Sequence, residues 1–213
     1  MKRIGTGKAV RTIEKHFIVF EGIDGSGTTT QGKLLLDHCI QDGFPAVLTG
    51  EPTSNCIGKT IRRILKGEEK VQPSTLPLLF AADRNEHVYG ESGILSNIGS
   101  GNWVICDRYL FSSLAYQSID TPYRTISRLN ASFPLPGILF FLDVPPETGI
   151  ERIQGRETKE IFEVLEMQQK VRTQYKKVLS AFQHSGMGIK ILDGTLPAEQ
   201  VHREVWNFFQ SFR

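Results

Sequence analysis

Five short apolar runs alternate along the chain with longer segments of helical periodicity. The runs lie at residues 16–23, 45–50, 102–107, 137–144 and 188–193. Each run is almost continuously apolar, which is typical of strands in a sheet that is covered on both faces. Strands that alternate with helices pair in parallel, because each helix returns the chain to the edge where the previous strand began. The pattern therefore predicts an α/β domain with a doubly wound, five-stranded parallel sheet and helices on both faces.

A glycine-rich turn follows the first run and leads into a helical segment. Gly22, Gly25 and Gly27 belong to this turn. A turn of this kind between a strand and a helix is the setting of a phosphate-binding loop, in which backbone N–H groups and the helix N-terminus face the phosphate. The dinucleotide-binding pattern fails, because Thr30 stands where a third glycine is needed. We predict phosphate contacts from Gly22, Ile23, Asp24, Gly25, Ser26, Gly27, Thr28, Thr29 and Thr30.

The loop departs from the usual pattern at one position. Thr28 occupies the place of the lysine that normally supplies a positive charge to the β- and γ-phosphates. The hydroxyl of Thr29 is still in the position that usually ligates Mg²⁺. The alternative is a glycine-rich turn that binds nothing. In that case the presence of Asp24 and Thr29 at these positions would be coincidental.

The end of the third run carries a second group of polar residues. Asp107 is at the tip of a core strand, where a carboxylate can hold Mg²⁺ or its waters. The adjacent Arg108 can bridge phosphates through its planar guanidinium. Capping of a helix N-terminus is the alternative. It would explain one of the two following serines, but not Asp107-Arg108-Tyr109 together with Tyr116-Gln117. Two pairs at i,i+4 are expected to direct polar groups into the cleft: Ser112 with Tyr116, and Ser113 with Gln117.

Phe80 and Arg84 share one face of the helical segment between the second and third runs. An aromatic ring beside a guanidinium suits stacking on a base and hydrogen bonding to its carbonyl. Taken alone, the pair is more typical of a core phenylalanine and a solvated arginine.

Taken in order, these segments resemble the signatures of thymidylate kinases. The resemblance rests on EGIDGSGTTTQ, the EP pair after the second run, LLFAADR, DRYLFSSLAYQ and LDVPPE, and it extends from about residue 16 to the C-terminus. It implies the three-layer P-loop kinase fold, ATP and dTMP as substrates, Mg²⁺ as cofactor and a homodimer. It further implies that Asp24 approaches the 3′-hydroxyl or the metal, and that Arg108 bridges the two phosphates. The implied dTMP contacts are Glu51, Phe80, Arg84, Arg108, Ser112, Ser113, Tyr116 and Gln117, with Tyr116 against the sugar.

The same resemblance implies a lid at about residues 152–161 that supplies catalytic arginines. Arg152 is expected at the ATP phosphates, and Arg156 is expected to be catalytic together with Asp24, Asp107 and Arg108. Two family arginines are absent, however: Glu160-Ile161 replaces a frequent Asp-Arg pair, and Gly50 replaces the arginine before Glu-Pro. Lys159 could equally be a solvated charge. Three hypotheses follow: a working ATP:dTMP phosphotransferase, a nucleotide-binding homologue that has lost catalysis, or a kinase for another monophosphate.

Length and charge narrow the remaining possibilities. A chain of 213 residues can bury the core of one domain, and we expect that domain at 16–213 after a basic tail at 1–15. The formal net charge of +2 is too small to favour a nucleic acid or an acidic membrane as partner. No apolar run approaches the ~20 residues of a membrane span, so we expect a cytoplasmic protein. The three cysteines, Cys39, Cys56 and Cys106, have no metal-binding spacing.

Overall fold

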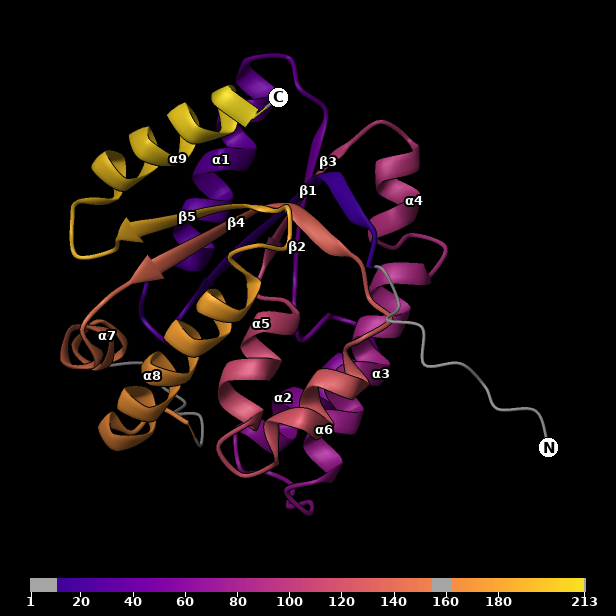
Figure 1. Cartoon of the computed structure of the whole chain (residues 1–213), viewed down its shortest axis with the longest axis vertical. Helices are drawn as coiled ribbons and strands as arrows, with labels where there is room; N and C mark the ends of the chain where they lie inside the picture. Colours follow the sequence, from indigo (N-terminus) through magenta and orange to yellow (C-terminus); the bar gives the residue numbers. More distant parts are fainter. Residues whose placement is uncertain (1–10, 155–161, 213) are drawn as a thin grey trace.

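The computed structural model describes residues 11–154 and 162–212 and contains the predicted parallel sheet (Figure 1). All neighbouring strands pair in parallel, in the order β2-β3-β1-β4-β5. Each predicted apolar run has become a strand, which confirms the fold class. The strands are β1 (Ile13–Gly22), β2 (Ala46–Gly50), β3 (Trp103–Asp107), β4 (Leu135–Asp143) and β5 (Gly188–Asp193).

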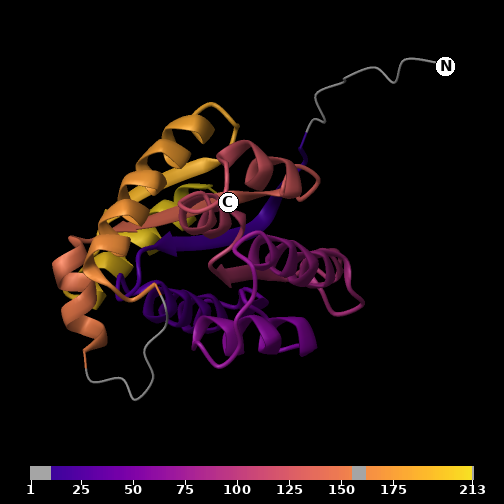
Figure 2. The same cartoon turned by 90° about the horizontal axis from the view of Figure 1, so that it is seen from below.

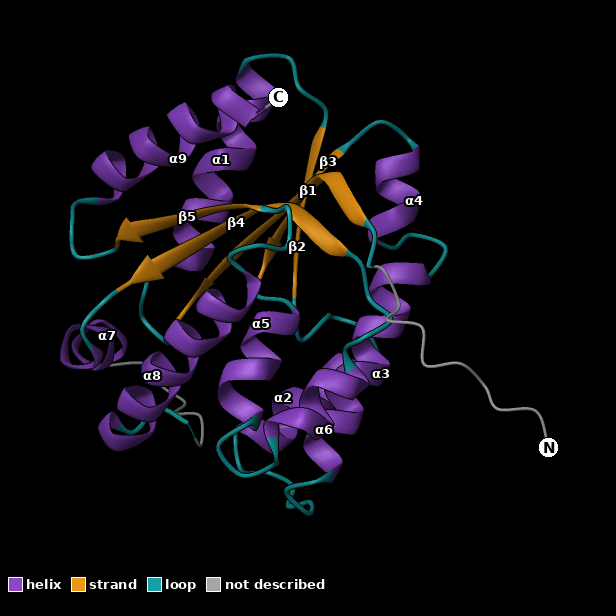
Figure 3. Ribbon diagram, in the orientation of Figure 1, coloured by secondary structure: helices purple, strands orange, loops and turns teal. Residues whose placement is uncertain are grey.

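Helices cover both faces of the sheet (Figure 3). Alternate residues of β1 enter two different cores: Phe17 and Val19 face one, Ile18 and Phe20 the other. The second core is closed by α1 and α9, and Figure 2 shows α8 and the α2–α3 pair on separate sides of the molecule. The helices are α1 (Thr28–Gln41), α2 (Cys56–Leu65), α3 (Thr75–Tyr89), α4 (Ile94–Gly99), α5 (Leu110–Ser112), the π-helical η1 (Ser113–Gln117), α6 (Tyr123–Leu129), α7 (Pro146–Ile153), α8 (Leu165–Phe182) and α9 (Ala198–Phe212).

The first strand begins earlier than the sequence predicts. Ile13 already pairs with Leu135 of β4, so residues 13–15 belong to the sheet and not to the predicted tail. The strand pattern is hidden there because Lys15 and His16 are exposed, beyond the part of β1 that is covered on both faces. The part of the tail at residues 1–10 lies outside the described residues.

The strand register brings the polar segments together at one edge of the sheet. Phe20 of β1 and Gly50 of β2 both lie beside Asp107 of β3, and Gly22 lies beside Leu142 of β4. The glycine-rich loop, the Asp107–Arg108 turn and the segment after β2 therefore meet at the carboxyl ends of three adjacent strands.

Candidate active site

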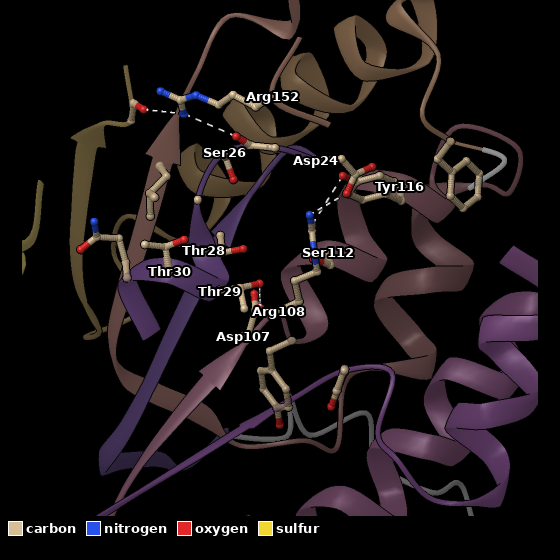
Figure 4. A pocket seen from close by; sticks show the side chains of 18 of the residues that line it. Asp24, Ser26, Thr28, Thr29, Thr30, Asp107, Arg108, Ser112, Tyr116 and Arg152 are labelled. Carbon is tan, nitrogen blue, oxygen red and sulfur yellow. Dashed lines mark hydrogen bonds and ion pairs between the residues drawn. The ribbon is translucent and has the colours of Figure 1, made fainter. Parts of the chain in front are cut away.

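A cavity of about 540 Å³ opens at this edge of the sheet (Figure 4). Most of the predicted site residues line it, and they come from elements far apart in the sequence. The predicted residues in its wall are Asp24, Gly25, Ser26, Gly27, Thr28, Thr29, Thr30, Glu51, Phe80, Arg84, Asp107, Arg108, Ser112, Tyr116, Gln117 and Arg152. Gly22, Ile23 and Ser113 are not in the wall, and Arg156 and Lys159 lie outside the described residues.

The glycine-rich loop needs its glycines for two separate reasons. Gly25 and Gly27 have φ angles of 76° and 98°, in the left-handed region that favours glycine. Gly25 also approaches α7, where a Cβ added to it would lie 2.2 Å from the carbonyl oxygen of Gly149. A Cβ at Gly149 would in turn lie 2.5 Å from the carbonyl oxygen of Asp24. The loop is therefore packed directly, backbone against backbone, on α7.

Two oxygen-bearing side chains meet where α1 begins. The hydroxyl of Thr29 donates a hydrogen bond to Asp107 Oδ2 (Figure 4). The other carboxylate oxygen, Asp107 Oδ1, is buried and has no hydrogen-bond partner. Hydroxyl and carboxylate oxygens are the ligand type that Mg²⁺ prefers. The described residues contain no group of three or more acidic, histidine or cysteine side chains that could hold a metal.

Arg108 lies at the centre of the cavity. Its φ angle of 67° is rare for a residue with a side chain. The guanidinium donates from Nη2 to Asp24 Oδ1 at 2.7 Å and from Nη1 to the carbonyl of Gly22 at 2.8 Å. It also lies 5.4 Å from the centroid of the Tyr116 ring. The turn after β3 thus holds a cation against the glycine-rich loop.

A buried carboxylate supports this turn from behind. Glu21 Oε1 accepts hydrogen bonds from the backbone N–H groups of Tyr109 (2.8 Å) and Ser112 (3.1 Å). Its Oε2 accepts from the hydroxyls of Ser112 (2.6 Å) and Tyr175 (2.7 Å). Burial raises the pKa of Glu21 from 4.5 to about 7, against the lowering effect of these bonds and of nearby Arg108. Sequence reasoning missed Glu21, although a glutamate inside a buried apolar strand is a visible signal.

Arg84 is buried rather than solvated, so the solvated-arginine alternative is wrong. Its side chain is 1% exposed. Its Nη2 donates to Glu51 Oε2 at 2.5 Å and to the hydroxyl of Ser113 at 3.0 Å, and its Nη1 donates to Asn130. Arg84 Nε is buried without a partner, and the residue lines the cavity together with Phe80. Ser113 therefore positions Arg84 from outside the cavity wall.

The polar residues after Ser112 do not follow the expected α-helical spacing. Residues Ser113–Gln117 form a π-helix, which turns less per residue than an α-helix. Tyr116 and Gln117 consequently both line the cavity, although they are adjacent in sequence. Gln117 Oε1 is buried there without a partner. Burial raises the pKa of the Tyr116 hydroxyl well above its usual value.

Arg152, which the family resemblance places at the ATP phosphates, lines the cavity together with residues that were not predicted there. Arg152, in the last turn of α7, donates to the carbonyl of Gly194 at 2.8 Å and to that of Gly25 at 3.4 Å. It is joined by a mixed set of residues: Gln31, Pro52, Arg62, Leu65, Leu142, Phe162, Glu163, Gly194, Leu196, Ala198 and Val201. Gln31, Pro52 and Leu142 belong to segments that carry the family resemblance but were not singled out there, and the others are single positions, of common residue types, on α2, α9 and loops.

Comparison with known proteins gives a consistent result. A sequence model of the family described as thymidylate kinase matches residues 20–205. The chain is 38% identical over 201 residues to a putative thymidylate kinase of Treponema pallidum, which covers 93% of this chain and 96% of the relative. It is 40% identical over 193 residues to a probable thymidylate kinase of Methanococcus aeolicus, covering 89% and 93%. Across the described residues, none of the helices has the length and apolarity to cross a membrane. The chain belongs to the thymidylate kinase family, and this membership supports the ATP-dependent phosphorylation of dTMP.

Proposed function

We propose that this chain transfers the γ-phosphoryl group of ATP to dTMP in the described cavity, giving dTDP and ADP. The observation that carries the proposal is a set of buried polar atoms in the cavity wall that have no hydrogen-bond partner. Buried polar groups are nearly always paired in folded proteins, so these atoms are expected to pair with a bound molecule. They are Ser26 Oγ, Gln31 Oε1, Arg84 Nε, Asp107 Oδ1 and Gln117 Oε1.

The cavity offers different chemistry at its two ends, which suits two different nucleotides. The glycine-rich loop and the N-terminus of α1 suit the ATP phosphates, and Leu196 and Val201 beside them offer an apolar surface for a base. At the other end Phe80 offers a ring for stacking on thymine, and Arg84 Nε and Gln117 Oε1 offer a donor and an acceptor for its edge. Arg108 lies between the two ends, where the acceptor and donor phosphates would meet.

Mg²⁺ is proposed to be held by Thr29 and Asp107, directly or through water. The unpaired Asp107 Oδ1 and the hydroxyl of Thr29 fit this hard cation, which keeps several waters and binds substrate phosphates in kinase sites. When bound, the ion would neutralise charge on the phosphate oxygens. A homodimer and a cytoplasmic location are further proposals from the family resemblance.

We propose that the lid replaces the cation lost at Thr28. Of the described arginines in the cavity wall, Arg84 and Arg108 are paired with carboxylates. Arg62 and Arg152 donate to backbone carbonyls. Arg156, with Lys159 as the alternative, is therefore the proposed source, although both lie outside the described residues.

The test is ADP release from ATP upon addition of dTMP, compared with dUMP, dCMP, dGMP and AMP. The proposal expects the highest kcat/KM for dTMP and no release without Mg²⁺. A protein that binds dTMP in calorimetry but releases no ADP would instead be a nucleotide-binding homologue without catalysis. A higher kcat/KM for another monophosphate would reassign the substrate.

A further inference from the structure

Gln168 is a buried glutamine that joins two parts of the active site. It lies in the first turn of α8 and is 0% exposed. Its Oε1 accepts from the backbone N–H of Asp24 at 3.1 Å, and its Nε2 donates to Asp24 Oδ2 at 2.7 Å and to the carbonyl of Phe162 at 2.8 Å. One amide thus contacts the glycine-rich loop and the segment that follows the predicted lid.

The neighbours of this amide determine its orientation. The Asp24 N–H can only donate, so it must face the oxygen of Gln168, and the Asp24 carboxylate must face the nitrogen. Both N–H bonds of the amide are then used, one on Asp24 and one on Phe162. No apolar side chain can reproduce this pattern, and neither can an ionised carboxylate.

Asp24 is consequently held from two sides. Its Oδ2 is bound by Gln168 and its Oδ1 by Arg108 Nη2 at 2.7 Å, while its side chain is 18% exposed. Without Gln168, Asp24 Oδ2 would lose this donor, and the carboxylate would be free to rotate toward Arg108 and bind it with both oxygens. Arg108 would then have fewer N–H groups available for phosphates.

We propose that Gln168 is a positioning residue. It fixes the Asp24 carboxylate so that only one carboxylate oxygen accepts from Arg108. It also links both residues to the chain at Phe162, whose ring and that of Tyr116 have centroids 5.7 Å apart. The geometry of the glycine-rich loop thereby becomes coupled to the segment that follows the predicted lid. This role rests on the proposed phosphotransferase function, because its effect is on the reaction and not on the fold.

The experiment compares Gln168→Leu and Gln168→Glu with Gln169→Leu, a matched control at the next, exposed position of α8. Gln168→Leu should lower kcat about tenfold to hundredfold, the usual effect of losing hydrogen bonds to a charged group, with the KM values for both nucleotides nearly unchanged. Gln169→Leu should resemble the wild type. Melting temperatures and circular dichroism identify a variant that fails to fold.

Gln168→Glu supplies a readout that a purely structural role would not give. A protonated glutamic acid can copy the amide, since its O–H donates to Asp24 Oδ2 and its C=O accepts from the Asp24 N–H. The ionised form would repel Asp24; Arg108 and Tyr116 also face that carboxylate. The ratio of variant to wild-type kcat should therefore rise about tenfold as the pH falls from 8.5 to 6.

The role of Gln168 would be overturned if the kcat ratio of Gln168→Glu to wild type did not change between pH 8.5 and 6. A wild-type kcat in Gln168→Leu would overturn it as well. The wild-type protein separates this failure from that of the proposed function. If the wild type releases no ADP with dTMP, the proposed function fails and the positioning role fails with it. If the wild type is active and only the variants disagree, the role of Gln168 alone is refuted.

Discussion

The buried carboxyl of Glu21 makes the stability of this protein depend on pH in a predictable way. Burial raises the pKa of Glu21 to about 7 from an ordinary value of 4.5. Between these two pH values the unfolded chain releases this proton while the folded chain retains it. The folded state therefore binds more protons there, and the free energy of unfolding must fall as the pH rises. At 1.36 kcal/mol per pH unit, the loss across this interval is about 3 kcal/mol.

The substitution Glu21→Gln hardly changes the shape of the side chain and removes its titratable carboxyl group. The new NH₂ group would face the hydroxyls of Ser112 and Tyr175, which can accept as well as donate. The oxygen would continue to accept from the backbone N–H groups of Tyr109 and Ser112. Glu21→Gln should therefore fold with its hydrogen bonds satisfied, which makes it a clean reference for the wild type.

Urea unfolding of both proteins at several pH values between 4.5 and 8 measures the effect. Other groups titrate equally in the two proteins, so the difference in the free energy of unfolding isolates Glu21. We expect the free energy of unfolding of Glu21→Gln to rise by about 3 kcal/mol relative to that of the wild type between pH 4.5 and 7. Above pH 7 the difference should not grow further. A difference that does not change with pH would show that Glu21 is ionised in the fold, stabilised by its four donors.

Other predictions concern the nucleotides. Phe80→Ala should weaken dTMP binding by about 1–3 kcal/mol, measured by calorimetry, since it removes a stacking surface; unchanged affinity would exclude Phe80 from the site. A smaller residue at Tyr116 should narrow the kcat/KM ratio between dTMP and its ribose counterpart. Thr29→Val should raise the Mg²⁺ concentration needed for half-maximal rate. If lid cations already occupy the space, Thr28→Lys should leave kcat unchanged; a rise of about 10²–10³ would instead mean that the natural enzyme lacks a cation there.

The sequence predicts most of the fold because the sheet is covered on both faces. Such strands are almost continuously apolar, and all five were found to within a few residues. The beginning of β1 was missed because Glu14 and Lys15 belong to the sheet but lie outside its covered part. The phosphate loop was found because its backbone conformation requires glycine at fixed spacing.

The supporting residues could not be predicted in the same way. Gln168 is one of two adjacent glutamines, and only the tertiary structure determines which of them reaches Asp24. Ser113 was expected in the cleft from an α-helical spacing with Gln117, whereas Ser113–Gln117 form a π-helix and Ser113 is not in the cavity wall. The pair taken alone favoured a solvated Arg84, because its buried partners Glu51 and Asn130 are far away in sequence.

The contact between Gly25 and Gly149 has a consequence for substitutions at both positions. A side chain at either position would collide with backbone of the other segment, at 2.2 Å and 2.5 Å respectively. Neither collision can be relieved by a smaller side chain, because both are with backbone carbonyl oxygens, those of Gly149 and Asp24. A displacement of α7 would relieve both collisions at once, but the left-handed φ angle of 76° at Gly25 would still disfavour a side chain there. The steric costs of the two alanine substitutions should therefore be less than additive, while the conformational cost at Gly25 remains in either background.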